Sequence, residues 1–544
     1  MIARVAGIAV LCLCPLATLA ISTTVIGDDR LEPDDLPEPQ AEIVRDPASV
    51  ALPAIPVFDL PAAQPGEHRP RELRVHGKRL LDAQIKVRGH VTWIYDCEAE
   101  LKRVYPPLSR QQLRTAIDHD PTLCSQPKFY LGDARDTDRD ASIWVADAPP
   151  QLKLELGDRV VVTGTWATWS PHAERNTEGL LVFGSLERVA PGAAEPPVVA
   201  SPRPSPAPAA EPEIAVVAQP PMRKVFDEHA RSVSVTLLNA CNKAIAARRF
   251  NDAITECGAA TGIWDGNHLA WYAWASAHLA RSEWRAAGTA IARAVALRPD
   301  RGMYQLYDGI ARYETAIQKA RDDAAAAQHR RPDEVALDPS RLALDDARDA
   351  LRRAVRLMPG LWRAHYYLGR VYRDLEDAGR AAEQFTAAIA SNPAHHLSYI
   401  ALCELYRRWG YLDQALAVAL RGAERVRPTE AADLWFEVGL THDARHLDDK
   451  AIAAFGKALD TRPRDAHARF QRGQIYFRTG DFANARLDLE EVIKSSDPRL
   501  AAAQPIAQQL LHQMAVQDQL AHQPRPRPAG RTVERLDPPR QITP

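Results

Sequence analysis

WRAHYYLGRVYRDLEDAGRAAEQFTAAIASNP, residues 362–393, is the stretch of this 544-residue chain that carries the strongest structural pattern. Its apolar residues recur with a helical period in two runs, which predicts two short amphipathic helices separated by a tight turn at Gly379. Small residues such as Gly369 and Ala381 let the two helices approach closely, while large aromatic residues fill the remaining space. Pro393 ends the second helix because proline has no N–H to donate.

The same spacing recurs on both sides of this stretch. Related units begin near residues 234, 268, 302, 396, 432 and 466. The pattern resembles the tetratricopeptide repeat, a helix pair of about 34 residues, and one such repeat cannot bury its apolar face alone. Seven units over roughly residues 234–499 therefore predict a stacked all-α solenoid. In the unit from Gly302 the second helix comes late, so residues 311–340 are an insertion that lengthens the helices or forms a loop between them.

The N-terminal end of the chain predicts export. Residues 1–20 combine Arg4, an apolar run and small residues, which is typical of a secretory signal peptide. An uncleaved membrane anchor and lipidation at Cys12 or Cys14 are the alternatives, so contact with a membrane is expected through this end alone. Residues 21–68 are acidic and proline-rich, which predicts a disordered spacer. We expect the protein in the periplasm or cell envelope.

A second folded unit is expected between residues 69 and 190, where the apolar period changes to that of strands. The predicted elements are one short helix over Ser109–Ile117 and five strands, Gln84–Tyr95, Lys128–Leu131, Ser142–Ala146, Arg159–Trp169 and Leu180–Arg188. Five strands in so short a region predict a small all-β barrel, and the openings QIKVRGHVTWIY and GDRVVVTGTWATW resemble the first and fourth strands of an OB-fold.

The remaining segments connect and finish these units. Residues 191–222 form a proline- and alanine-rich linker, expected to hold the barrel and the solenoid apart. The solenoid region spans residues 223–521, with a capping helix expected over Pro505–Met514. Residues 522–544 are predicted to be a disordered tail.

The cysteines predict two disulfides in an exported protein. Cys97 and Cys124 flank the predicted barrel helix, so a disulfide between them would hold together the two ends of the segment that contains this helix. Cys241 and Cys257 occupy positions that face each other across the helix pair of the first repeat. The alternative for each pair is buried free thiols, and Cys403 is expected to be such a thiol.

Chemistry-bearing motifs are missing from the sequence, which has no G-x-S-x-G, P-loop, H-E-x-x-H or C-x-x-C pattern. We therefore expect a non-enzymatic protein without a cofactor. Asp136, Asp138, Asp140 and Asp147 partly imitate a calcium loop, but Ala141 replaces its glycine, so a solvated turn and no metal is the preferred interpretation. A net charge of -2 and a barrel with balanced charges argue against nucleic-acid binding. Trp93, Trp144, Trp166 and Trp169 are candidates for a stacking surface, although their alternating strand positions favour the core for some of them.

The resemblance to tetratricopeptide repeats implies a groove lined by the first helix of each repeat, where a protein or peptide partner binds. Carried onto this chain, the groove residues are Tyr272, Arg363, Tyr366, Arg370, Arg373, Arg407, Arg408, Phe436, Phe470 and Arg478. Aromatic rings among arginines suit an extended or helical segment that carries carboxylates. The alternative is that the arginines form an ordinary solvated face and the aromatic residues pack between repeats.

These features together predict an exported adaptor whose solenoid binds a protein partner and whose barrel is a second module. The alternative is that the barrel binds a small ligand, glycan or metal while the repeats mediate self-assembly. The sequence names no partner and no oligomeric state.

Overall fold

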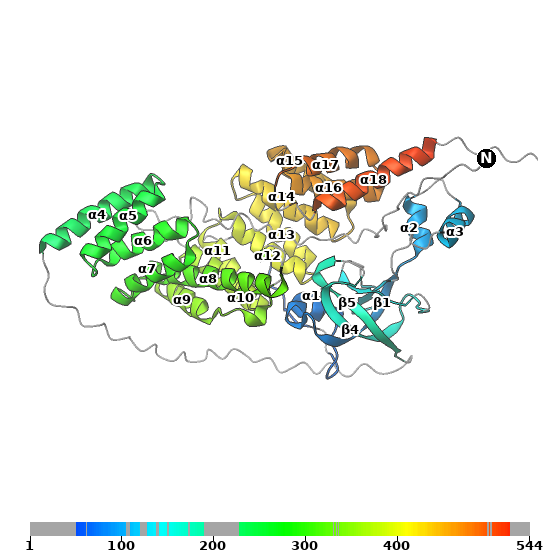
Figure 1. The fold of residues 1–544 in the computed structure, drawn as a ribbon, viewed down its shortest axis with the longest axis horizontal. Coiled ribbons are helices and arrows are strands. Elements are labelled where there is room, and N and C mark those ends of the chain that lie inside the picture. The colour runs from blue at the N-terminus through cyan, green and yellow to red at the C-terminus, as the bar shows by residue number, and fades with distance from the viewer. Residues whose placement is uncertain are drawn as a thin grey trace, which may run out of the picture.

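The fold is taken from a computed structural model of the chain. It describes residues 50–522 apart from residues 61–62, 105–108, 120–127, 138–140, 150–151, 172–174, 190–227, 330, 333–334, 336, 498–499 and 501–502. The predicted signal peptide, the linker and the tail lie outside the described residues. The two folded parts are a small closed β-barrel and an all-α solenoid, which confirms the predicted all-β barrel followed by a helical solenoid (Figure 1).

The barrel is closed by five strands in the order β1-β2-β3-β5-β4. The strands are β1 (Gln84–Ile94), β2 (Phe129–Gly132), β3 (Ile143–Ala146), β4 (Arg159–Trp169) and β5 (Arg175–Arg188). Strand β1 pairs antiparallel with both β2 and β4, and β3 pairs parallel with β5. The alternating burial along β1 sends every second side chain into the barrel, as the period of two predicts.

Trp166 fills one end of the barrel core and is 1% exposed. The backbone of Gly179 passes so close to its indole that an added Cβ would lie 2.2 Å from the ring, and Gly179 has a φ of +111°. Glycine is needed there both for space and for backbone conformation. Trp144 is also buried, so the proposed stacking surface loses two of its four tryptophans to packing.

Helices precede and follow β1 in the sequence of the barrel region. The expected helix is present as α3 (Arg110–His119), and α2 (Cys97–Val104) precedes it. Two further elements stand before the first strand, α1 (Pro70–His76) and the 3-10 helix η2 (Gly77–Leu80). These two elements were not predicted, because seven and four residues are too few to show a helical period.

Among the described residues, the solenoid has seven antiparallel helix pairs followed by one further helix. The pairs are α4 (Glu228–Ala246) with α5 (Phe250–Ile263), α6 (His268–Ala280) with α7 (Trp284–Leu297), α8 (Gly302–Gln328) with α9 (Asp345–Leu357), α10 (Trp362–Asp374) with α11 (Ala378–Ser391), α12 (His396–Arg408) with α13 (Leu412–Ala423), α14 (Pro428–Asp443) with α15 (Asp448–Thr461), and α16 (Ala466–Thr479) with α17 (Phe482–Lys494). Helix α18 (Ala503–His522) packs on α17 where a capping helix was expected.

The predicted contact between small and large residues is present in the α10–α11 and α14–α15 pairs. An added Cβ on Gly369 would lie 2.6 Å from the ring of Phe385, and the equivalent Gly439 is as close to Phe455. The predicted turn at Gly379 is wrong. Gly379 lies inside α11, and the turn is centred on Glu376, which has a positive φ and precedes the helix cap made by Asp377.

The insertion after Gly302 takes both expected forms. It extends α8 to 27 residues and adds the 3-10 helix η6 (Pro339–Arg341) before α9. Element η6 lies against η2 of the barrel region, so the insertion reaches the other folded part. The insertion therefore makes a contact with the barrel region that the repeat pattern alone does not predict.

The barrel lies beside the middle of the solenoid and contacts it through α1 (Figure 1). Residues 191–222 lie outside the described residues, so the spacer role expected of them stays a prediction, while α1 supplies a direct interface between the two parts. The prediction of disorder over residues 21–68 is wrong for residues 50–60, which pack on the solenoid core. No helix among the described residues is both long and apolar enough to span a bilayer.

Candidate functional site

The candidate site is the place where residues 50–60, which we call the strap, lie on the solenoid. The strap is extended and forms no helix or strand. Val50, Leu52, Phe58 and Leu60 are half-buried and pack against the solenoid core, while Ile55 and Val57 remain exposed. Over its last residues burial alternates with a period of two, which is the signature of an extended chain lying on a surface.

Phe58 is the anchor of the strap because three aromatic residues of the solenoid surround its ring. Its centroid lies 5.0 Å from Trp409 and 5.7 Å from Tyr411, both edge-on, and 6.2 Å from Tyr406, which is stacked. The Tyr411 hydroxyl also donates a hydrogen bond to the carbonyl of Val57. Aromatic pairs in these geometries add to the stabilisation that burial provides.

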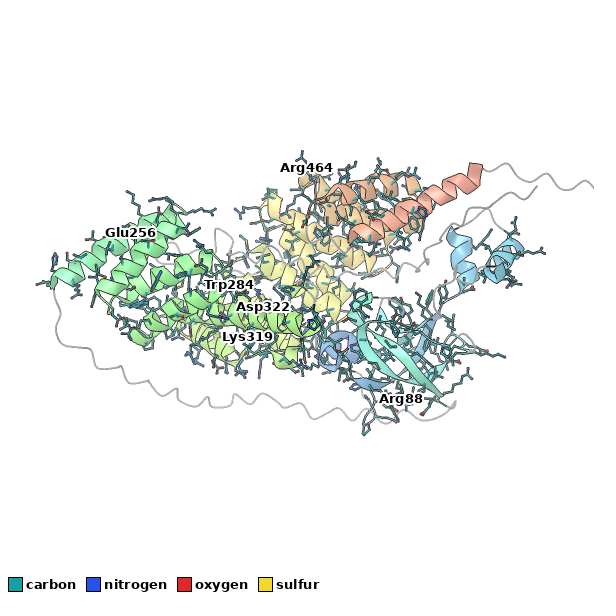
Figure 2. All side chains as sticks on the ribbon, viewed as in Figure 1. Arg88, Glu256, Trp284, Lys319, Asp322 and Arg464 are labelled. Atoms are coloured by element: carbon teal, nitrogen blue, oxygen red, sulfur yellow. A yellow bond between two sulfur atoms is a disulfide. The ribbon has the colours of Figure 1, made fainter. Side chains whose placement is uncertain are left out.

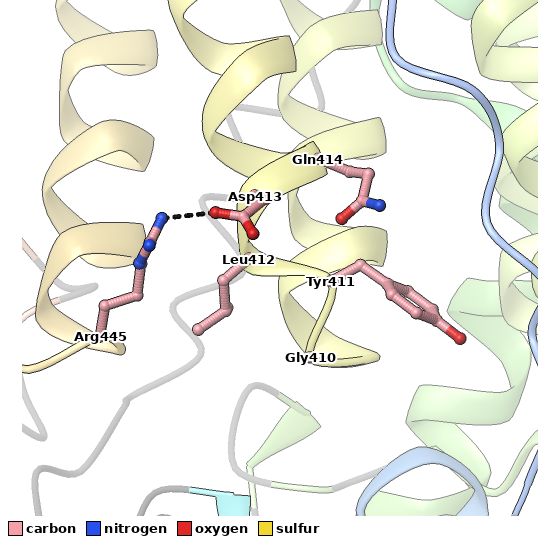
Figure 3. Close-up of a pocket in the computed structure, with 6 residues that line it drawn as sticks. All are labelled: Gly410, Tyr411, Leu412, Asp413, Gln414 and Arg445. Carbon is pink, nitrogen blue, oxygen red and sulfur yellow. Dashed lines mark hydrogen bonds and ion pairs between the residues drawn. The ribbon is translucent and has the colours of Figure 1, made fainter.

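The 409–411 turn, which joins α12 to α13, makes this pocket. Gly410 has a φ of +80°, so the chain reverses sharply and presents Trp409 and Tyr411 on either side. A shallow hollow of about 460 Å³ continues beyond Tyr411 (Figure 3). It is lined by Gly410, Tyr411, Leu412, Asp413, Gln414 and Arg445.

The same turn also receives helix α1 of the barrel region. The Arg71 guanidinium donates to the Trp409 carbonyl at 2.7 Å and lies over the rings of Trp409 and Tyr411. In the opposite direction, Arg408 donates to the Val75 carbonyl at 2.9 Å. The strap and the barrel therefore meet on one turn of the solenoid.

The α1 contact, which we call the dock, has an apolar centre and a charged rim. Val75 is 3% exposed and belongs to the solenoid core rather than to the barrel core. At the rim, Glu376 of the turn after α10 pairs with Arg79 and lies 3.1 Å from His76. A carboxylate so well buried needs such partners, because an unpaired charge would be costly there.

The predicted groove arginines are mostly engaged inside the chain. Arg370 pairs with Glu314 at 3.1 Å and lies over the rings of Tyr313 and Tyr367. Two more join neighbouring repeats, Arg407 with Glu437 at 3.6 Å and Arg478 with Asp443 at 2.7 Å. The three pairs connect successive first helices, so they stabilise the stacking of repeats.

The other predicted groove residues divide between stacking and burial. Tyr272 stacks on Tyr304 at 5.0 Å, and burial raises the pKa of its hydroxyl well above its usual range. Phe436 and Phe470 are buried in repeat cores. These three fit the alternative interpretation, in which the aromatic residues pack between repeats, and their role toward a partner stays a prediction.

Arg363, Tyr366 and Arg373 lie, like Arg370, on α10 and contact side chains of the solenoid. Arg363 lies over the ring of Trp362, and Tyr366 contacts the ring of His395 at 4.9 Å. Arg373 forms a pair with Asp374 at 2.9 Å, and the pKa of that carboxyl is lowered because Arg373 and Tyr313 donate to it despite its burial. Arg408 is the one predicted groove residue whose described hydrogen bond reaches the barrel region.

The residues that sequence reasoning missed are those of the pocket itself. Tyr406, Trp409 and Tyr411 were not predicted to bind anything, because the groove positions implied by the resemblance stop before the turn. A signal was present: two aromatic residues flank Gly410 in the turn, where tetratricopeptide repeats need no aromatic residue for helix packing.

The cysteines take the positions that their repeat register implies. Cys241 and Cys257 form a disulfide across α4 and α5, with Cα atoms 5.3 Å apart. Cys97 is disulfide-bonded, but Cys124 lies outside the described residues, so that pairing stays a prediction. Cys403 is a buried free thiol, and burial raises its pKa well above the usual range.

The described residues show which side chains are placed to bind a metal and how charge is distributed, and the expected absence of nucleic-acid binding stays a prediction. They contain no group of three His, Cys, Asp or Glu side chains placed to hold a metal, while Asp138 and Asp140 of the acidic stretch lie outside them. Charged side chains of both signs are spread over the solenoid and the barrel, for example Lys319 and Asp322 on α8, Glu256 on α5 and Arg88 on β1 (Figure 2).

The geometry defines a class of protein, a helical-repeat solenoid that holds an extended segment. Residues 343–396 and 449–503 match the family model of the tetratricopeptide repeat. These parts of the solenoid are tetratricopeptide repeats, as the sequence pattern predicted. No curated protein matches the chain.

Several solved structures match part of this chain at low similarity. A tetratricopeptide repeat protein from Parabacteroides merdae is 12% identical, with 52% of this chain and 99% of that chain covered and a TM-score of 0.38. For pilF of Pseudomonas aeruginosa the values are 15%, 43%, 95% and 0.33. For YrrB, described as a TPR protein with an unusual peptide-binding site, they are 16%, 42%, 99% and 0.28. Such low values place no site and no partner on this chain.

Proposed function

We propose that this chain is an exported, non-enzymatic adaptor of the periplasm or cell envelope, whose solenoid binds a protein or peptide partner. The observation that carries the proposal is the strap, because it is an extended polypeptide already seated on the solenoid through Phe58. A surface that accepts one extended segment has the shape and the apolar character to accept another.

The position of the barrel supports an adaptor. The dock holds the barrel against the turn that contacts Phe58, so the barrel, the solenoid and one peptide site meet at the 409–411 turn. A partner bound at the 409–411 turn would therefore lie beside the barrel, and a second partner of the barrel would be brought close to the first. The chemistry needed for this work is binding alone.

The proposal is tested by crosslinking and pull-down of the mature protein in its native envelope extract. Wild type is compared with Tyr411→Ala, which removes a wall of the pocket, and with the matched control Leu420→Ala on the outer part of α13, whose side chain is 38% exposed. The proposal requires a protein partner that wild type and Leu420→Ala capture and that Tyr411→Ala loses. Capture of no protein beyond background, or equal capture by all three chains, contradicts it.

Export has a separate test. N-terminal sequencing of the protein purified from the envelope fraction should find a chain that begins after residue 20. Recovery of the full-length chain from the cytoplasm alone would contradict export and leave partner binding to be judged by the pull-down.

A further inference from the structure

We propose that the strap is a built-in competitor for the partner, and that the partner carries an extended segment of the same chemistry. That chemistry is an aromatic ring, an aliphatic residue two positions later, and prolines upstream that keep the segment extended, as in Pro56, Phe58 and Leu60. The inference rests on the proposed function, because it names the class of partner and the way its binding is regulated.

The pocket is built for one aromatic ring. Tyr406, Trp409 and Tyr411 all contact the half-buried Phe58 ring, and Tyr406 and Trp409 are themselves buried. An aromatic anchor in a desolvated pocket is the usual centre of a peptide interface. Asp59 points away from burial and is exposed, so the residue between the two apolar positions is free to vary.

The strap has the features of a displaceable segment. Its apolar anchors are half-buried rather than fully enclosed, and Ile55 and Val57 are 38% and 53% exposed. The amides of Leu52 and Asp59 donate to carbonyls of the strap itself, those of Val50 and Val57, instead of joining a ladder with the solenoid. A partner of equal length could make the same side-chain contacts without breaking secondary structure.

The short connection between Phe58 and Arg71 makes the strap an effective competitor. Phe58 stands thirteen residues before Arg71, which is fixed on the same turn by the dock. A segment held by so short a connection has an effective concentration in the millimolar range, about that of other short flexible tethers. A free partner must exceed this competition, and the displaced strap stays close enough to return.

A labelled synthetic peptide of residues 50–60, VALPAIPVFDL, tests the proposal by fluorescence anisotropy against the full chain. The Phe58→Ala chain, whose own anchor is gone, should bind this peptide at least about tenfold more tightly than wild type does. The matched control Val57→Ala, altered at an exposed strap position, should bind it as wild type does. A peptide with alanine in place of its phenylalanine should bind the Phe58→Ala chain about thirtyfold more weakly.

Three outcomes would overturn the proposal. In the first, the peptide binds none of the chains, and in the second it binds wild type and Phe58→Ala with equal affinity. The third is a concentration-dependent dimer of wild type that Phe58→Ala converts to a monomer in sedimentation, since the strap would then bridge two copies instead of competing within one.

Failure of this inference is distinguishable from failure of the proposed function. In one result, wild type captures a partner that Tyr411→Ala loses and that Phe58→Ala captures no better than wild type does. That result overturns competition by the strap and is consistent with the adaptor function. Tight peptide binding by Phe58→Ala, with no partner recovered from the envelope extract, supports competition and contradicts the adaptor function.

Discussion

The strap and the dock contact the same turn of the solenoid by different means. The dock buries Val75 in the solenoid core, joins backbone carbonyls to Arg71 and Arg408, and surrounds Glu376 with two basic side chains. The strap relies on apolar side chains that are half-buried and on one aromatic anchor. The contrast teaches that the dock is suited to hold the barrel permanently, whereas the strap is suited to be exchanged.

The largest expected effect comes from Val75→Asp, which should break the dock. Burying a carboxylate in place of the valine removes apolar contact and desolvates a charge, at a cost on the order of 4 kcal/mol. The barrel should separate from the solenoid, and the radius of gyration measured by small-angle X-ray scattering should rise. Leu156→Asp makes the same change at a barrel position that is 69% exposed and should leave the radius as in wild type.

Removal of the Cys241–Cys257 disulfide comes next and should spare both contacts. The bridge closes a loop of 16 residues, for which chain-entropy arguments give about 3 kcal/mol. In the Cys241→Ser/Cys257→Ser chain, hydrogen exchange should accelerate in α4 and α5 alone, since each repeat is stabilised mainly by its neighbours. Faster exchange in α12 as well would show that the helix before the 409–411 turn depends on the end of the array.

Phe58→Ala should release the strap while the barrel stays docked. Loss of a central interface aromatic residue costs about 2 kcal/mol, which is enough to free a half-buried segment. Limited proteolysis should then cut within residues 50–60 while the radius of gyration stays close to that of wild type. Val57→Ala is the control, and resistance of both variants to cleavage would mean that Phe58 is not the anchor.

Acidification should lower the free energy of unfolding of the solenoid around α12, the helix that ends at the turn contacted by the strap and the dock. His395 precedes α12 and contacts Trp362 and Tyr366, and its burial, with a smaller effect of His396, lowers its pKa well below the usual range. The unfolded chain therefore binds this proton more readily, and stability present above about pH 6.5 falls by up to about 1.4 kcal/mol per pH unit below it.

His395→Gln should flatten this pH dependence in denaturant titrations between pH 7.5 and 5.5. Replacement of the exposed His512 on α18 by glutamine serves as the control and should leave the slope unchanged. An unchanged slope in His395→Gln would show that another group dominates the acid response.

Local patterns predicted the parts of the molecule but not their contacts. The helix pairs, the long α8, the five strands and the small-against-large packing of Gly369 on Phe385 all follow from periods within one segment. The turn was misplaced because Gly379 looked like a turn residue, whereas Glu376 adopts the positive φ that the reversal needs. Non-glycine residues rarely do so, and nothing in the local pattern marks the exception.

The candidate site was hidden for a related reason. The prolines of residues 50–60 remove backbone donors and blur any period, so the strap was interpreted as disordered. Its alternating burial exists only against the solenoid, which lies more than three hundred residues away in sequence. The internal partners of two groove arginines were hidden in the same way, since Glu314 and Glu437 come to Arg370 and Arg407 from neighbouring repeats.

Fluorine NMR of the full chain with 4-fluorophenylalanine at position 58 tests the central claim most directly. The account predicts that the rings of Tyr406, Trp409 and Tyr411 shift the fluorine resonance of residue 58 away from that of a solvent-exposed 4-fluorophenylalanine. Excess unlabelled VALPAIPVFDL peptide should displace the strap and move this resonance to the solvent-exposed position. A resonance at the solvent-exposed position in the untreated chain, or a shifted one that the peptide never moves, would contradict it.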